Sequence, residues 1–346
     1  MSDVFARSVA GRTLSIQIGK FAHQANGAVA VQYGNTVVLA TACSGSEPRE
    51  GIDFAPLTVD YEERLYAAGK IPGSFIRREG RPTEEAVITS RLIDRSLRPL
   101  LSKAFHYDVQ VVATVLSVDQ ENEPDICALI GASAALTLSD IPFLGPISAV
   151  HVGYIDSALV VNPPLAQMEN SLLDVVVAST GKNIVMVEAG AKEVSEEILL
   201  EAIRLGHEAN QEIIRLQEGL QRTGGKTKVE IKSKELALEL SSQIAAILGE
   251  KLGRVLEEPG KLQRDKALTS LKEEIKNKLA DSFSEDEINV AFETQLKAAV
   301  RAKILQTRRH LDGRQTKEIR PISCEVGVLP RTHGSGLFAR GETQVV

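Results

Sequence analysis

The chain has 346 residues, of which 43% are hydrophobic and 25% are charged, and its formal net charge is −6. This length is typical of two or three domains, and the composition excludes wholesale disorder, collagen-like chains and disulfide scaffolds. The acidic balance excludes a globally basic nucleic-acid-binding surface but permits a local basic patch. Three widely separated cysteines and the lack of a signal peptide or long apolar run predict a cytoplasmic protein without a membrane span.

Residues 1–218 alternate between short strand-like and helix-like segments, which predicts a first α+β domain. β-branched residues gather at 37–42, 109–117, 147–155, 172–177 and 184–188, and predict strands there. Helical spacing predicts a helix at 83–98, with acidic residues in its first turn. Small residues predict a tightly packed, buried helix at 125–138, and Ser195 is expected to cap a long helix at 195–216.

The sequence pattern changes after residue 218. Residues 219–232 are polar and rich in Gly, Lys and Thr, and we interpret them as a linker. Residues 233–310 repeat apolar side chains only at helical period, which predicts a separate all-helical domain of about three helices. A strand-like pattern returns at 311–346.

An internal repeat connects the two ends of the chain. Residues 27–38 align without a gap with residues 334–345, and both copies share two glycines and a threonine at the same positions. A Gly-Arg pair precedes each copy, at 11–12 and at 313–314. Residues 311–346 are therefore expected to begin a second copy of the first domain. Because ~35 residues cannot bury a core, we expect the chain to be the front part of a longer polypeptide.

Basic residues are concentrated between positions 64 and 103, and a glycine-bounded loop at 73–82 places Phe75 beside Arg77 and Arg78. An aromatic ring can stack on a base while guanidinium groups neutralise phosphates, a combination that suits single-stranded nucleic acid. The same pattern is also compatible with a solvated basic loop whose phenylalanine lies in the core.

Three arginines, Arg91, Arg95 and Arg98, share one face of the helix predicted at 83–98. Their mutual repulsion requires anions nearby, which either phosphate or RNA backbone could provide. Carboxylates such as Asp94 or Glu62 offer the alternative of ordinary salt bridges. The six histidines show no metal-ligand spacing, so no metal site is predicted among them.

Several of these stretches resemble one known family. Residues 34–36, 75–82 and 90–99 are similar to the first core domain of the bacterial polynucleotide phosphorylase family, and residues 333–344 to the opening of its second core. The resemblance extends over the whole chain. It implies an α+β fold, with an RNase PH-like core (ribosomal protein S5 domain 2-like) at 1–218 and an all-α domain at 233–310. The truncated start of a second RNase PH-like core is expected at 311–346.

The resemblance also implies an activity, that of a polyribonucleotide nucleotidyltransferase. Such an enzyme degrades mRNA by processive 3′-to-5′ phosphorolysis of single-stranded RNA, in which inorganic phosphate attacks and nucleoside diphosphates are released. It implies Mg²⁺ as cofactor, a homotrimeric ring, and partners from an RNA-degradation complex. The alternative is a catalytically inactive RNA-binding ring subunit of an exosome-like assembly.

Residue by residue, the resemblance matches the loop at 75–78 with the loop that grips RNA in the family's channel. Ile76 stands where the family usually has a second aromatic residue. The full set of expected RNA-binding residues is Phe75, Ile76, Arg77, Arg78, Arg81, Arg91, Arg95 and Arg98.

The same comparison implies that the first core is not catalytic. Asp174 matches the position of the catalytic aspartate, but Met168 stands where active cores have a second acidic metal ligand, and a thioether is a poor ligand for Mg²⁺. Glu123 and Asp125 replace serines that meet the attacking phosphate, and two carboxylates would repel it. We therefore expect no catalytic residue and no metal ligand within 1–346. The first core would thread RNA and build the ring, and the catalytic and Mg²⁺-binding residues would lie beyond Val346.

Overall fold

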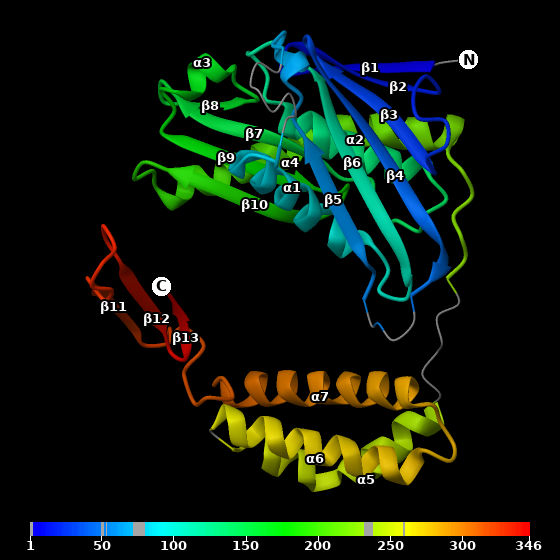
Figure 1. Ribbon diagram of the computed structural model, residues 1–346, viewed down its shortest axis with the longest axis vertical. Helices are drawn as coiled ribbons and strands as arrows, with labels where there is room; N and C mark the ends of the chain where they lie inside the picture. The colour runs from blue at the N-terminus through cyan, green and yellow to red at the C-terminus, as the bar shows by residue number, and fades with distance from the viewer. Residues whose placement is uncertain (1–2, 50–51, 53, 72–79, 232–237, 259) are drawn as a thin grey trace. The chain divides into compact units, whose positions relative to one another are not determined.

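The computed structural model describes residues 3–49, 52, 54–71, 80–231, 238–258 and 260–346 (Figure 1). The chain forms two compact units, Met1–Ser233 and Lys234–Val346. Within the described ranges, no helix combines the length and the apolar character needed to cross a membrane.

A six-stranded sheet forms one layer of the first unit. Its strand order is β1 (Asp3–Val9), β2 (Arg12–Ile18), β3 (Gly27–Tyr33), β4 (Thr36–Pro48), β6 (Tyr107–Ser117) and β5 (Leu57–Glu62). All neighbours are antiparallel except β5 and β6. Alternate residues of β6 are buried, as expected for a sheet with one face in the core. The strands predicted at 37–42 and 109–117 are confirmed, and they pair with each other in this sheet.

A second, antiparallel sheet has the order β10 (Ile184–Ala191), β9 (Leu173–Ser179), β7 (Ser148–Ile155) and β8 (Ala158–Val161). Two helices are packed on the sheets: α2 (Pro124–Leu138) against β3 and β4, and α4 (Glu196–Gly224) against β7 and β9. The two helices also contact each other. Three shorter helical segments, η1 (Leu65–Ala68), η2 (Arg98–Leu100) and α3 (Leu165–Met168), join these elements.

Both predicted helices of the first half are confirmed. Helix α1 (Glu84–Leu97) begins after Thr83, whose side chain accepts a hydrogen bond from the backbone N–H of Ala86 at 3.0 Å. Helix α2 is buried from residue 126 to residue 138, as its small side chains predict. Gly131 allows α2 to pack closely against β4, because a Cβ atom at residue 131 would lie 2.9 Å from the Cβ of Ala40.

The boundary of the predicted linker differs from the structure, because α4 continues to Gly224 and includes residues 219–224. The residues after it are held on the first unit. The backbone N–H of Lys226 donates to the carbonyl of Leu138, and that of Val229 donates to the carbonyl of Asp140. The ammonium of Lys228 donates to three carbonyl oxygens of 136, 137 and 139, at 2.6–3.0 Å. The polar residues at 226–229 therefore cap the C-terminal end of α2.

Changing Lys228 to Met is expected to lower the free energy of unfolding of the first unit by about 1–3 kcal/mol, since it removes the donor from the carbonyls of Thr137 and Ser139. Burial lowers the pKa of Lys228 to about 8, so the ammonium is still charged at neutral pH. Urea unfolding followed by circular dichroism measures the loss. The matched control is Lys226→Met, because that side chain is exposed and should change stability by under about 0.5 kcal/mol. Equal effects of both variants would contradict the capping role.

The second unit contains the helices predicted from the apolar period at 233–310. These are α5 (Leu238–Val255), α6 (Lys261–Leu279) and α7 (Glu285–Thr307). Their shared core includes Ile244, Ile275 and Phe292. Ser284 and Glu287 form a reciprocal capping box at the start of α7.

A three-stranded sheet follows in the order β11 (Ile322–Val326), β12 (Gly336–Arg340) and β13 (Thr343–Val345). Its hairpin repeats the β3–β4 hairpin of the first unit. Gly34 and Gly341 occupy the same turn position, with φ of 61° and 60°. Tyr33 pairs with Thr36 in the first hairpin, as Arg340 pairs with Thr343 in the second. A two-residue turn with glycine at its first central position requires this positive φ, which explains why the second glycine of each copy, Gly34 and Gly341, coincides in the repeat.

Candidate functional site

A cluster of three carboxylates surrounds one histidine at the positions that the resemblance matched with an active site. Asp125 lies in the first turn of α2, and Glu123 directly precedes that helix. His151 is on β7 and Asp174 is on the neighbouring strand β9. Residue 153 of β7 pairs with Asp174, so the side chains of His151 and Asp174 are diagonal neighbours on one face of the sheet.

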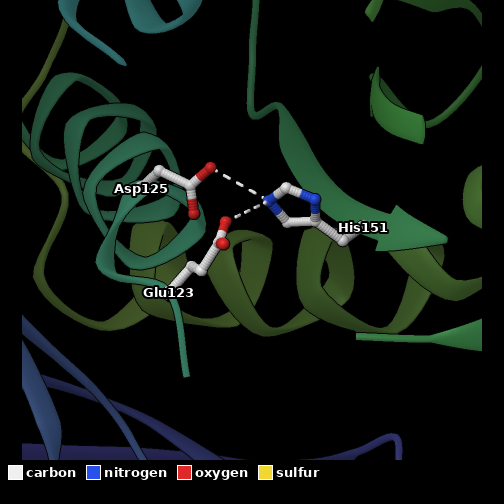
Figure 2. A group of neighbouring side chains, drawn as sticks. All are labelled: Glu123, Asp125 and His151. Carbon is white, nitrogen blue, oxygen red and sulfur yellow. Dashed lines mark hydrogen bonds and ion pairs between the residues drawn. The ribbon is translucent and has the colours of Figure 1, made fainter. Parts of the chain in front are cut away.

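The imidazole of His151 is bonded through both of its nitrogens. Its Nε2 lies 3.0 Å from Oδ2 of Asp125 and 3.2 Å from Oε2 of Glu123 (Figure 2). Its Nδ1 lies 2.9 Å from Oδ1 of Asp174. The side chains of His151 and Asp125 are only 12% and 15% exposed, so their charges interact with little screening by water.

These contacts favour a charged imidazolium. Burial alone would lower the pKa of His151, but the negative charge and hydrogen bond of Asp125, with the hydrogen bonds of Asp174 and Glu123, hold that pKa well above 6.5. Burial alone would likewise raise the pKa of Asp125, yet the facing His151 holds it below the usual value for aspartate. A protonated imidazole donates from both nitrogens, which matches the placement of carboxylates on both sides of the ring.

Three residues of the cluster lie close enough together to be compared with a metal site. Glu123, Asp125 and His151 each offer one ligand atom, and these atoms lie within 4.8 Å of one another. Mg²⁺ takes oxygen ligands in octahedral geometry, whereas this group offers two carboxylates and a nitrogen that already faces both of them. An imidazolium at His151 already places one positive charge within hydrogen-bond distance of these carboxylates. The described residues of this cluster therefore do not fit Mg²⁺.

The space beside the cluster is small. A cavity of ≈ 30 Å³ is lined by residues that include Glu123, His151 and Met168. On its other side, the guanidinium of Arg12 donates to the side chain of Asn122 and to the carbonyl of Asn162, and lies 4.7 Å from the centre of the Tyr33 ring. Such a volume admits an ordered water molecule but no nucleotide.

His151 is the residue of this site that the sequence did not reveal. The histidines have no metal-ligand spacing in the sequence, and His151 is 26 residues from Asp125 and 23 from Asp174. Only the strand pairing of β7 with β9 and the packing of α2 bring these groups together. The one available signal was the match of Asp174 and of the stretch at 123–125 to active-site positions.

The expected RNA-binding residues are only partly within the described chain. Phe75, Ile76, Arg77 and Arg78 lie outside the described residues, and Arg81 and Arg91 are exposed.

Arg95 and Arg98 each have a carboxylate partner. Nη1 of Arg95 is 2.9 Å from Oε2 of Glu188, and Nε of Arg98 donates to Oδ2 of Asp94 at 3.0 Å. The salt-bridge alternative therefore accounts for these two side chains, and their contact with RNA stays a prediction.

Comparison with known proteins identifies the family. Residues 10–142 match the model described as 3′ exoribonuclease family, domain 1, and residues 145–209 match domain 2 of the same family. Residues 239–315 match a model described as polyribonucleotide nucleotidyltransferase, RNA binding domain. The first two matches together correspond to the first unit, and the third corresponds to α5–α7 with the residues that follow.

Curated relatives named polyribonucleotide nucleotidyltransferase match nearly the whole chain. The relative from Heliobacterium modesticaldum is 52% identical over 99% of this chain and 49% of its own length. Those from Roseiflexus sp. and Caldicellulosiruptor bescii are 50% and 48% identical, over 46% and 50% of their own lengths. A solved structure, rice (Oryza sativa) Rrp46, matches with 16% identity and a TM-score of 0.49 over 64% of this chain and 95% of that chain.

The chain spans about half the length of the curated relatives it matches. Both core-domain models and the curated relatives point to the same family. The chain belongs to the 3′ exoribonuclease family, and over its whole length it is similar to polyribonucleotide nucleotidyltransferases.

Proposed function

We propose that the protein acts in a polyribonucleotide nucleotidyltransferase that degrades single-stranded RNA from its 3′ end by phosphorolysis and releases nucleoside diphosphates. The names of the relatives and the match to an RNA-binding domain support this proposal. It includes inorganic phosphate as co-substrate, Mg²⁺ as cofactor, a homotrimeric ring, RNA-degradation partners and a cytoplasmic location. The catalytic residues and Mg²⁺ ligands would be supplied from beyond Val346.

Within this enzyme, the first unit would guide RNA and build the ring without catalysing. One observation carries this part of the proposal: the imidazole of His151 fills the space between the carboxylates that stand where phosphate and metal would bind. The carboxylates of Glu123 and Asp125 would repel a negatively charged phosphate. The adjoining cavity of ≈ 30 Å³ has the size of an ordered water molecule. The basic residues at 75–81 and on α1 would contact the RNA backbone.

The alternative of an inactive exosome-like ring subunit is not favoured. Relatives that match 98–100% of this chain at 45–52% identity all carry the name of the enzyme.

The expected result with the 346-residue chain is that it releases no nucleoside diphosphate from poly(A) in the presence of phosphate and Mg²⁺. Thin-layer chromatography of labelled products measures this directly, and circular dichroism verifies that the chain is folded. The positive control is the whole protein, which should release diphosphates only when phosphate is present. Diphosphate release by the 346-residue chain would overturn the non-catalytic assignment. Monophosphates formed by the whole protein without phosphate would overturn the phosphorolytic one.

A further inference from the structure

Helix α7 is divided into an acidic and a basic half. Between residues 281 and 293 there is no Lys or Arg, and the acidic residues are Asp281, Glu285, Asp286, Glu287 and Glu293. Between residues 294 and 311 there is no Asp or Glu, and the basic residues are Lys297, Arg301, Lys303, Arg308 and Arg309. In a chain of net charge −6, this is a marked local excess of positive charge.

The two halves also differ in their partners. The acidic half is paired with α6, through Lys276 with Glu285 at 2.5 Å and Lys272 with Glu293 at 3.8 Å. In the basic half, no carboxylate of the described chain forms an ion pair with Lys297, Arg301 or Lys303. Within the described residues, these three side chains therefore have no acidic partner.

The dipole of α7 does not account for these positions. Positive side chains stabilise the C-terminal end of a helix, but the effect is confined to the last turn. Lys297 stands ten residues before the last residue of α7, Thr307, and Arg301 stands six residues before it. Neither cation is placed to stabilise the helix end.

Lys297 and Arg301 share one face of α7, because residues four apart are neighbours on a helix surface. They border a shallow groove of ≈ 470 Å³ whose other lining residues are aliphatic: Leu296, Val300, Ile304 and Leu305. Leu305 is 55% exposed. The groove thus combines two unpaired cations with apolar surface along one helix face.

We propose that this face of α7 binds single-stranded RNA, with Lys297 and Arg301 on successive phosphates and the aliphatic side chains against riboses and bases. The inference rests on the proposed function and adds a surface to it, since the matched RNA-binding domain at 239–315 contains these residues. Phosphates supply the negative charge that no described carboxylate supplies here. The lining has no aromatic ring to stack on a base, so the contact is independent of RNA sequence.

The test is a salt series of RNA binding with the 346-residue chain and with the double variant Lys297→Ala, Arg301→Ala. A fluorescently labelled oligoadenylate is the probe, and anisotropy gives the affinity. Each lost phosphate contact reduces the dependence of log K on log salt by about 0.7, so the slope should become shallower by about 1.4. At about 0.1 M salt the affinity should fall on the order of 10-fold. Alanine favours helix, so α7 should keep its fold.

The matched control is Lys261→Ala with Lys266→Ala on α6, which removes the same charge from exposed positions of the same unit. This control should bind RNA like the unchanged chain. Equal loss in both double variants would overturn the proposal, because charge alone would then explain it, and so would an unchanged slope in the α7 variant.

Two further outcomes separate this inference from the proposed function. Binding by the unchanged chain that the α7 variant does not weaken would defeat the groove alone. Absence of RNA binding by the unchanged chain would defeat both the groove and the guiding role of the first unit. Competition by poly-glutamate as effective as that by unlabelled RNA would identify an acidic protein surface as the occupant and would also overturn the proposal.

Discussion

Changing His151 to Gln is expected to lower the free energy of unfolding of the first unit by about 3–5 kcal/mol. Glutamine can still donate a hydrogen bond, but it has no positive charge to set against three carboxylates. Asp125, whose side chain is 15% exposed, would remain as a buried charge without a counter-ion. Urea unfolding followed by circular dichroism measures the loss.

The matched control is Arg95→Gln, which also removes a cation from a carboxylate. The Arg95 and Glu188 side chains are 50% and 44% exposed, so water screens the pair and its removal should cost under about 1 kcal/mol. Adding Asp125→Asn to His151→Gln should recover part of the stability, because it removes the stranded charge. Similar losses for His151→Gln and Arg95→Gln, with no recovery in the double variant, would contradict an internal ion cluster.

The pH dependence gives an independent check with a definite sign. Burial lowers the folded-state pKa of His151, but the negative charge and hydrogen bond of Asp125 and the hydrogen bonds of Asp174 and Glu123 together outweigh burial and raise that pKa well above 6.5. The stability that protonated His151 contributes is therefore fully present below pH 6.5 and is lost as pH rises through the folded-state pKa. The difference in unfolding free energy between the unchanged chain and His151→Gln should shrink at alkaline pH. A difference that grows with pH would show that the histidine is neutral in the folded protein.

Local signals in the sequence were sufficient for strands β4, β6, β7, β9 and β10 and for helices α1, α2 and the first part of α4, but not for strands β1, β2, β3, β5 and β8. The helix at 84–97 carries its own cap at Thr83, and α2 is recognisable because small residues run along all its faces. The β-branched runs of β4 and β6 are buried on one face of the sheet, which is the environment that such residues favour. The coincidence of Gly34 and Gly341 also has a local cause, since both residues occupy the same position of a hairpin turn.

Features that depend on tertiary contact could not be predicted in this way. Residues 226–229 have the polar composition of a linker. Their polar groups instead cap the C-terminal end of α2, which lies about ninety residues earlier in the chain. The bonds of His151 join three elements whose proximity depends on the sheet pairing. The sequence pattern predicts that the long helix ends at residue 216, but α4 continues to Gly224 and includes Gln217.

Gln217 is in fact part of a closed polar ring inside the core of the first unit. Its Nε2 donates to the carbonyl of Ile147 at 2.9 Å, and its Oε1 accepts from the hydroxyl of Ser133 at 2.7 Å. The same hydroxyl accepts from the backbone N–H of Ile147 at 2.9 Å. Ser133 and Gln217 are both fully buried. The ring therefore joins α2, α4 and the residue before β7 with these polar groups satisfied.

Changing Gln217 to Ala is expected to destabilise the first unit by about 3 kcal/mol, because two buried groups would lose their partner at about 1–3 kcal/mol each. The matched control is Gln221→Ala, the same substitution one turn further along α4 at an exposed position, which should change stability by under about 0.5 kcal/mol. Thermal and urea unfolding of both variants measure the difference. If the two substitutions cost the same, the ring contributes nothing, and the contact between α2 and α4 rests on their apolar side chains alone.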